Sequence, residues 1–316
     1  MKKAFEKLNL RDYGVLLGFL ALCIAISIAT PSFLGKQNIL NLLRQSSIIG
    51  IISAGMTFVI ISGNFDISVG AVAALAGAIT MKFATGGTNL FASMLLGVAI
   101  CAVIGLINGI VVAKINVPSL IATMAMVTIV RGLLLMLTGG YPITENIPIL
   151  DYIGNGYLFN IPIPVVIFFI VVLVSFTVLN KTKFGRYVYS VGGNQEASKL
   201  NGINVDSHKV KVFIINAVLA GIAGIVLTGR LGTATAIAGE GYDMDAIASV
   251  VIGGTSVAGG SGSVLKTVIG VLLMSVINNS FNLLGIDVYF QYIFKGLIIL
   301  AAVGFDSYSK KKLASR

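Results

Sequence analysis

The sequence has very little charge, and that shortage excludes most classes of soluble protein. Only 11% of its 316 residues are Asp, Glu, Lys or Arg, whereas 56% are hydrophobic and the mean hydropathy is +0.97. A typical soluble domain carries roughly 25% charged residues. A chain with less than half of that charge cannot cover a surface that faces water, and disorder, collagen and a nucleic-acid-binding fold are excluded for the same reason. The sequence therefore predicts a protein of the lipid bilayer.

Residues that form disulfides or bind metals are also scarce. The two cysteines, Cys23 and Cys101, lie inside apolar runs, and the single histidine, His208, lies in a polar stretch. A disulfide framework needs more cysteines, placed in loops, and a metal site needs a cluster of ligands at suitable spacing. We expect free, packed thiols, and neither a metal nor another cofactor in this chain.

Motifs for nucleotide chemistry are incomplete. The stretch 262–267 resembles a phosphate-binding loop, but Leu265 stands where that motif needs a glycine directly before the lysine. The glycines of 253–262 lack the spacing of a dinucleotide-binding fingerprint. We therefore expect a chain that is not an enzyme.

Long, continuous apolar runs are what the sequence does contain, and they predict helices rather than the alternating strands of a barrel. The glycines, 37 in number, suit close packing between membrane helices. Eight runs are clear and two, at 67–83 and 245–258, are interrupted by glycine. The clear ones are 14–29, 46–62, 89–113, 118–138, 161–179, 209–229, 264–284 and 288–305. The predicted fold is all-α and polytopic, with about ten transmembrane helices.

The distribution of Lys and Arg predicts the orientation of these helices. The N-terminus, the C-terminus and the loop 180–211 together hold fourteen of the 22 basic residues, whereas 139–160 holds none and 230–245 holds only Arg230. Basic loops stay on the cytoplasmic side. Both termini and 180–211 are therefore predicted inside and the other two loops outside, which ten spans satisfy. The net charge of +10 follows from this topology and needs no nucleic-acid partner.

Two glycine-rich breaks in the apolar runs, at 63–70 and 253–262, lie in opposite halves of the chain and indicate where a polar path could run. Irregular backbone is tolerated within a membrane only where it is buried in protein or lines a cavity, and transporters place such breaks around their substrate. The alternative for the first break is structural, with Asp66 or Ser68 capping the helix that follows. The two breaks hint at a two-half architecture. The residues expected to line or shape the path are Asn64, Asp66, Ser68, Thr255, Ser256, Asn278 and Asn279.

Two cations inside apolar runs, Arg131 and Lys295, leave two interpretations open. A charged side chain at the centre of a membrane helix costs about 2.5–3.5 kcal/mol on insertion scales. Each residue either reaches the membrane surface or a buried partner, or it lies on a polar pathway.

A short polar helix is predicted within the cytoplasmic loop. Asn194 is a suitable cap for a helix that begins near Gln195 and stops at Gly202. Such a helix is too short to be stable alone, and it suits docking into a groove of a partner. The alternative is an ordinary basic loop on the inner leaflet.

Four blocks, in order, resemble the membrane subunits of bacterial sugar-importing ABC transporters, the ribose-type permease family. They are 54–78 (AGMTFVIISGNFDISVGAVAALAGA), 182–205 (TKFGRYVYSVGGNQEASKLNGINV), 241–264 (GYDMDAIASVVIGGTSVAGGSGSV) and 278–303 (NNSFNLLGIDVYFQYIFKGLIILAAV). The resemblance extends over nearly the whole chain. It implies one permease domain, 1–316, with a coupling loop at about 180–208, in the bacterial cytoplasmic membrane.

The resemblance also implies which residues couple the chain to its partners. ABC importers dock their ATPase through a helix with the pattern Glu-Ala-Ala, three residues, Gly, which Glu196, Ala197 and Gly202 match, with Ser198 in place of the second alanine. The implied partners are an ATPase with two fused nucleotide-binding domains, a sugar-binding protein outside, which would dock on 139–160 and 230–245, and a second copy of the permease. The expected cargo is ribose or a similar monosaccharide.

Three other functions remain open at this point. An ion-coupled secondary transporter would need carboxylates within the membrane, and only Asp66 qualifies in the sequence. The related permeases for branched-chain amino acids would share the machinery but carry another cargo. A membrane scaffold or receptor would transport nothing.

Overall fold

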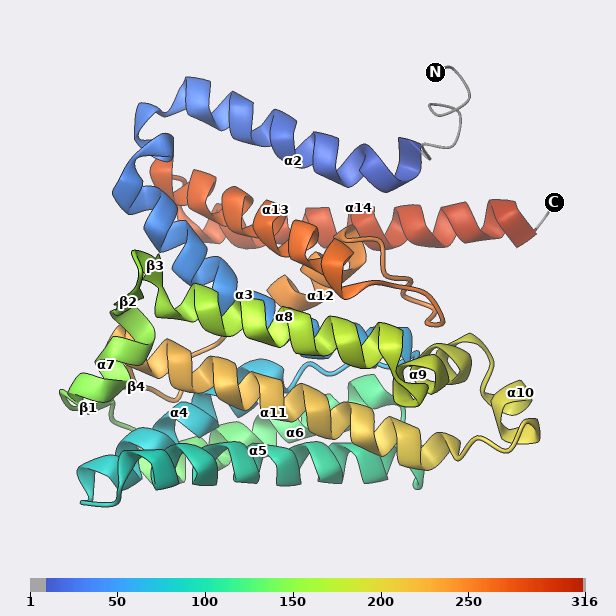
Figure 1. Cartoon of the computed structure of the whole chain (residues 1–316), viewed down its shortest axis with the longest axis horizontal. Helices are drawn as coiled ribbons and strands as arrows, with labels where there is room; N and C mark the ends of the chain where they lie inside the picture. The colour runs from blue at the N-terminus through green and yellow to red at the C-terminus, as the bar shows by residue number, and fades with distance from the viewer. Residues whose placement is uncertain (1–9, 315–316) are drawn as a thin grey trace.

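The computed structural model describes residues 10–314, which are almost entirely helical (Figure 1). The elements, in chain order, are α2 (Leu10–Ala29), the 3-10 helix η1 (Pro31–Leu34), α3 (Lys36–Ile61), α4 (Val69–Thr85), α5 (Leu90–Ala113), α6 (Ser119–Thr138), β1 (Ile143–Thr144), α7 (Pro148–Asn155), β2 (Tyr157–Leu158), β3 (Ile161–Pro162), α8 (Ile163–Lys181), α9 (Lys183–Gly193), α10 (Gln195–Leu200), α11 (Val205–Leu231), β4 (Thr233–Ala234), α12 (Tyr242–Ile252), α13 (Val264–Leu283) and α14 (Val288–Ala314).

The all-helical prediction is confirmed, with two small departures. Strand β1 pairs antiparallel with β4, and β2 pairs with β3, each pair being two residues long. Within the described residues, the helices α3, α5, α6, α8, α11 and α13 are long and apolar enough to cross a bilayer. Shorter apolar stretches lie in α2, α4 and α14. This is the composition of a polytopic membrane protein.

Small residues set the packing at the centre of the molecule, where α11 contacts α3, α4 and α5. A Cβ added to Gly109 of α5 would lie 2.7 Å from the Cα of Val210, and one added to Gly224 of α11 would lie 1.8 Å from the carbonyl oxygen of Ala73. Only glycine permits backbones to approach so closely. The outer helices instead expose large apolar side chains to their surroundings, among them Phe91, Met136 and Phe169, as expected beside lipid.

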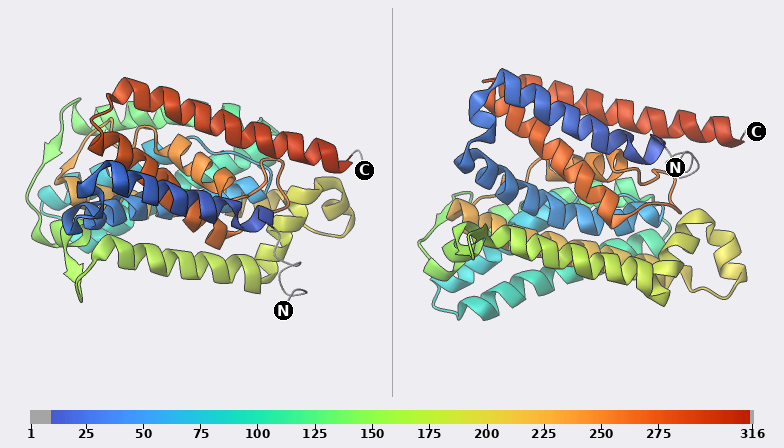
Figure 2. Two further views of the ribbon diagram at one scale, coloured as in Figure 1. Left: turned by 90° about the horizontal axis from the view of Figure 1, so that it is seen from above. Right: turned by 45° about the horizontal axis from the view of Figure 1, so that its top comes forward.

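Different elements lie at the two ends of the molecule. Helices α9 and α10 lie at the end where α2 begins and α14 finishes, and α7 with the two β ribbons lies at the opposite end (Figures 1 and 2). The basic segments that the sequence places on one side of the membrane therefore lie together in the fold. Of these, Lys2, Lys3, Lys7 and Arg316 lie outside the described residues.

Both predicted breaks are present. The first separates α3 from α4 over 62–68, and the second separates α12 from α13 over 253–263. Gly63 and Gly254 take φ values of +78° and +89°, which side chains with a Cβ rarely adopt. The breaks also touch each other, because the Gly260 amide donates a hydrogen bond of 2.8 Å to the carbonyl of Ile61.

Candidate functional site

The first break is organised around the carboxylate of Asp66, which is 1% exposed. One oxygen accepts hydrogen bonds from the amide and hydroxyl of Ser68, at 2.9 and 2.5 Å, and the other accepts from the amide of Asn216 at 2.9 Å. The Ser68 hydroxyl in turn accepts from Asn108 at 3.1 Å. The network thus joins the start of α4 to α5 and α11.

This geometry gives the first break a structural role. Asp66 caps α4 by accepting from the Ser68 amide, whereas the Ser68 side chain makes no capping bond to the helix. Asn64 is 6% exposed and bonds only locally, to Ser62. A place for Asn64, Asp66 and Ser68 in a substrate path therefore stays a prediction.

The second break is also tightly packed. Thr255 and Ser256 are 1% and 3% exposed. The Ser256 hydroxyl accepts from the amide of Ala258 at 3.2 Å, and its own amide donates to the carbonyl of Ser261 at 3.0 Å. The Thr255 hydroxyl is buried without a hydrogen-bond partner among the described residues. A role for these two residues in the path likewise stays a prediction.

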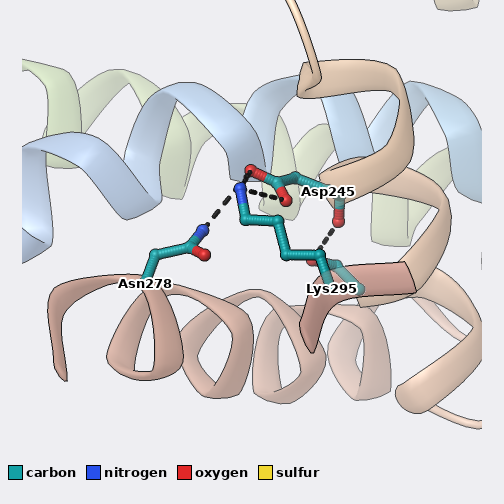
Figure 3. A network of polar contacts seen from close by, with 4 residues as sticks. Asp245, Asn278 and Lys295 are labelled. Atoms are coloured by element: carbon teal, nitrogen blue, oxygen red, sulfur yellow. Dashed lines mark hydrogen bonds and ion pairs between the residues drawn. The ribbon is translucent and has the colours of Figure 1, made fainter. Parts of the chain in front are cut away.

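Asp245, in the first turn of α12, is the centre of a second polar network (Figure 3). The ammonium of Lys295 from α14 lies 3.0 and 3.1 Å from its two carboxylate oxygens, and the amide of Asn278 from α13 donates at 3.4 Å. Lys295 therefore has a buried partner, and this cluster fastens three helices together. Neighbouring Asn279 instead exchanges two hydrogen bonds with Asn38 of α3, at 2.8 and 3.0 Å.

Arg131, the other cation within an apolar run, lines a cavity of about 730 Å³ between α4, α6, α12 and α14. Its guanidinium donates to the carbonyls of Ala236 and Ala238, in the loop between β4 and α12. The nearby charges are those of Glu240 and Asp243, which line the same cavity.

The predicted cytoplasmic helix is present as α10. The side chain of Asn194 caps it by accepting from the Ala197 amide at 2.9 Å, and Gly202 follows it with a φ of +77°. Glu196 and Ala197 are exposed, and so is Leu200, at 89%. Ser198 is buried, with its hydroxyl 2.9 Å from that of Ser190 in α9. The serine that departs from the family pattern thus ties α10 to α9.

Helix α9 connects α10 with both breaks. The Tyr189 hydroxyl donates to the carbonyl of Gly262 at 3.0 Å, and burial raises the pKa of this phenol, so it remains a protonated donor at neutral pH. Gly192 packs so closely on α3 that an added Cβ would lie 1.7 Å from the Ile61 carbonyl oxygen. A displacement of α10 can therefore reach the breaks through rigid contacts.

Several residues of these networks were not singled out from the sequence. Asn108 and Asn216 look like isolated polar residues of apolar runs, and their partners lie 40 and 150 positions away. The signal available was the cost of burying an amide without a partner, which predicts a bond but does not identify it. For Asp245, likewise, the cost of burying a charge predicts a partner but does not identify it. Among the described residues, no group of three His, Cys, Asp or Glu could hold a metal ion.

Comparison with known proteins gives a family and relatives that span the chain. A family model described as "Branched-chain amino acid transport system / permease component" matches residues 38–303. The ribose import permease protein RbsC of Haemophilus influenzae is 44% identical, over 93% of this chain and 94% of the relative. The Bacillus subtilis RbsC is 43% identical, over 94% and 93%. The L-arabinose transport system permease protein AraH of Escherichia coli is 35% identical, over 95% and 92%. No solved structure matches the chain.

Proposed function

Because the chain belongs to the family of branched-chain amino acid transport system permease components, we infer that it is the permease of an ABC sugar importer in the bacterial cytoplasmic membrane. The observation that carries this function is identity of 43–44%, over more than nine-tenths of both chains, to two ribose import permeases. The sequence-based interpretation of the chain as a transport subunit rather than an enzyme is confirmed. The cargo class is sugar rather than branched-chain amino acid, with ribose the first candidate.

The partners follow from this function. Import requires an ATPase on the cytoplasmic side and a binding protein that delivers the sugar outside. We propose that the ATPase carries two fused nucleotide-binding domains and that two copies of this permease enclose the path. The chain, a single permease domain, would hold no cofactor, since ATP is hydrolysed by its partner.

A ten-pass topology with both termini cytoplasmic is supported by the order of elements. The six long apolar helices provide six passes, and α2, α4, α12 and α14 provide four. Helix α12, at 11 residues, is too short to span the bilayer alone, and α4, at 17, is at the lower limit of length; the breaks complete their passes. The basic segments then fall inside and the β ribbons outside, in agreement with the distribution of charge.

An inverted repeat of the two halves is supported by matching residues at matching places. The sequence Phe-Asp-Ile-Ser at 65–68 directly precedes α4, and Tyr-Asp-Met-Asp at 242–245 forms the first turn of α12. Their last members bond equivalent asparagines one helix later, Ser68 to Asn108 and Asp245 to Asn278.

One helix further on, in α6 and α14, stand Arg-Gly-Leu at 131–133 and Lys-Gly-Leu at 295–297. The correspondence is too short to stand out along the sequence, but in the fold it relates α3–α6 to α11–α14. The two glycine breaks would then belong to opposite halves of one duplicated unit.

The mechanism we propose is alternating access. A binding protein with bound sugar docks on the outer segments 139–160 and 230–245. On the cytoplasmic side, the ATPase binds α10 through Glu196, Ala197 and Leu200. Closure of the ATPase moves α10 and, through Ser198 and Tyr189, moves α9 against the breaks. Gly192 and Gly260 keep the backbones in contact, so that the displacement is transmitted rather than absorbed.

The path we propose runs between two copies of the permease, past both breaks. Asn64, Asp66, Ser68, Thr255, Ser256, Asn278 and Asn279 shape it. Their burial favours support of the path walls over contact with the sugar.

The function is tested by sugar uptake in cells that lack the chain. Deleting the chain should abolish high-affinity uptake of one pentose, and re-expression should restore it. A panel of labelled ribose, xylose, arabinose and leucine identifies the cargo. Loss of leucine uptake with all three sugars unaffected would contradict the sugar assignment.

A further inference from the structure

The cavity beside Arg131 combines a fixed cation with two carboxylates. Arg131 projects from α6, Glu240 and Asp243 come from the loop and first turn of α12, and Thr128 lies one turn before Arg131. Its volume of about 730 Å³ is within the range of ligand sites and exceeds what one monosaccharide needs. Met124, Val127, Ile237 and Met244 supply apolar walls.

The guanidinium is anchored but retains free donors. Arginine carries five N–H groups in a rigid fork. Nη1 provides both bonds to the carbonyls of Ala236 and Ala238. The three N–H groups on Nε and Nη2 have no hydrogen-bond partner among the described residues, and neither nitrogen is enclosed. The backbone therefore orients Arg131 and leaves one edge of the fork available to a ligand.

The two carboxylates line the same cavity as Arg131 without forming an ion pair with it. Glu240 and Asp243 act on Arg131 electrostatically, yet no ion pair within 4 Å joins them to it among the described side chains. Glu240 is exposed and Asp243 half-buried. A cavity lined by both a donor, Arg131, and acceptors, Glu240 and Asp243, suits a molecule that both accepts and donates hydrogen bonds.

We propose that this cavity is a transient binding station for an unphosphorylated monosaccharide, with Arg131 donating to sugar hydroxyls and Asp243 and Glu240 accepting from them. The proposal rests on the proposed function. The two carboxylates outnumber the single guanidinium, so the site repels a sugar phosphate. The Tyr292 side chain, 61% exposed at the cavity wall, offers an aromatic face to the C–H groups of the sugar.

The station is tested first in vesicles that hold the complete importer, with wild-type permease, Arg131→Met or Asp243→Asn. The measured quantity is sugar moved per ATP hydrolysed. We expect at least a fivefold fall in both variants, with the basal ATPase rate of the complex, which reports assembly of the permease with its ATPase, changed less than twofold. Lys114→Met and Asp287→Asn, which remove the same kinds of charge outside the cavity, should keep the wild-type ratio.

A second measurement needs only the purified permease and reports occupancy directly. A Thr128→Cys variant places a thiol in the cavity, and its reaction with a small thiol reagent should slow at least twofold in tens of millimolar of the transported sugar. The same concentration of leucine, or of the sugar phosphate, should not slow it, and a Thr88→Cys thiol should react at one rate throughout.

The possible results distinguish failure of the proposed importer function from failure of the proposed sugar-binding station. A wild-type importer that moves no sugar with ATP contradicts the proposed function itself. The station alone is overturned if the importer works, its Asp243→Asn variant keeps the wild-type ratio, and sugar does not protect the thiol of the Thr128→Cys variant. Protection of that thiol by leucine and not by sugar also overturns it.

Discussion

At the residue scale, the contact between Lys295 and Asp245 is the one ion pair within 4 Å among the described side chains. Asp245 is 6% exposed at its side chain and Lys295 is 23% exposed, so water screens the pair poorly. Removing one partner of a buried pair leaves the other charge uncompensated, at a cost of about 3–5 kcal/mol. The pair holds α14 to α12 (Figure 3). Helix α14 has few other contacts with the body of the molecule.

We predict that Lys295→Met lowers the thermal unfolding midpoint of the detergent-purified permease by several degrees. Asp245→Asn combined with Lys295→Met should recover much of the loss, because no charge is then left unpaired. Lys82→Met, which removes an exposed lysine at the end of α4, should leave the midpoint unchanged. A double variant less stable than Lys295→Met alone would contradict this account of the pair.

Asp66 leads to a second prediction at the residue scale. Its carboxylate accepts three hydrogen bonds within the protein. Asp66→Asn replaces one acceptor oxygen with a donor, and we expect a loss of about 1–3 kcal/mol in unfolding free energy. Uptake by the protein that remains folded should keep its preference among sugars. A changed preference would instead place Asp66 in contact with the cargo.

At the scale of elements, α9 is the part through which α10 reaches the transmembrane region. Its two terminal glycines provide a matched comparison. A Cβ on Gly192 would lie 1.7 Å from the Ile61 carbonyl oxygen, whereas a Cβ on Gly193 would lie 3.9 Å from its nearest neighbour, the Cα of Gly260. Gly192→Ala must therefore push α9 away from α3, and Gly193→Ala need not.

We predict that Gly192→Ala reduces sugar moved per ATP by at least fivefold, and Gly193→Ala by less than twofold. The ratio is measured in vesicles with the ATPase and the binding protein. Equal ratios in the two variants would exclude α9 as the route of coupling.

The exposed face of α10 supports a prediction about docking. Glu196→Lys reverses a charge at the start of this helix without disturbing its cap, since Asn194 forms the cap. We expect the variant to insert normally and to lose ATP-driven uptake, as measured by transport together with membrane content. Unchanged uptake would exclude the docking role of α10.

These elements also show which features of the fold could be predicted from the sequence alone. Asn194, Gln195 and Gly202 predict α10 because a cap and a stop act over a few residues. The breaks, predicted at 63–70 and 253–262 and present at 62–68 and 253–263, are predicted for the same local reason. Two distant partners, Asp245 of Lys295 and Asn216 of Asp66, could not be predicted, since they lie 50 and 150 positions away and depend on how α11, α12 and α14 pack.

At the scale of the whole molecule, the ten-pass topology depends on α12, which is too short to cross alone, and on α4, which is at the lower limit of length. Thr88 follows α4 and Lys199 lies on α10. We predict that a Thr88→Cys thiol reacts with a membrane-impermeant reagent in intact cells, and that a Lys199→Cys thiol reacts only after the cells are opened. The unsubstituted chain, with Cys23 and Cys101, sets the background. Protection of the Thr88→Cys thiol in intact cells would mean that α4 does not complete a pass.

The central claim is that this chain forms the path of an ATP-driven sugar importer. The most direct test is uptake of labelled ribose, xylose and arabinose into vesicles that hold the permease, its ATPase and its binding protein. We predict that one pentose enters only when ATP is supplied, and that dissipating ion gradients leaves the rate unchanged. Entry that ignores ATP and follows an ion gradient would contradict the claim.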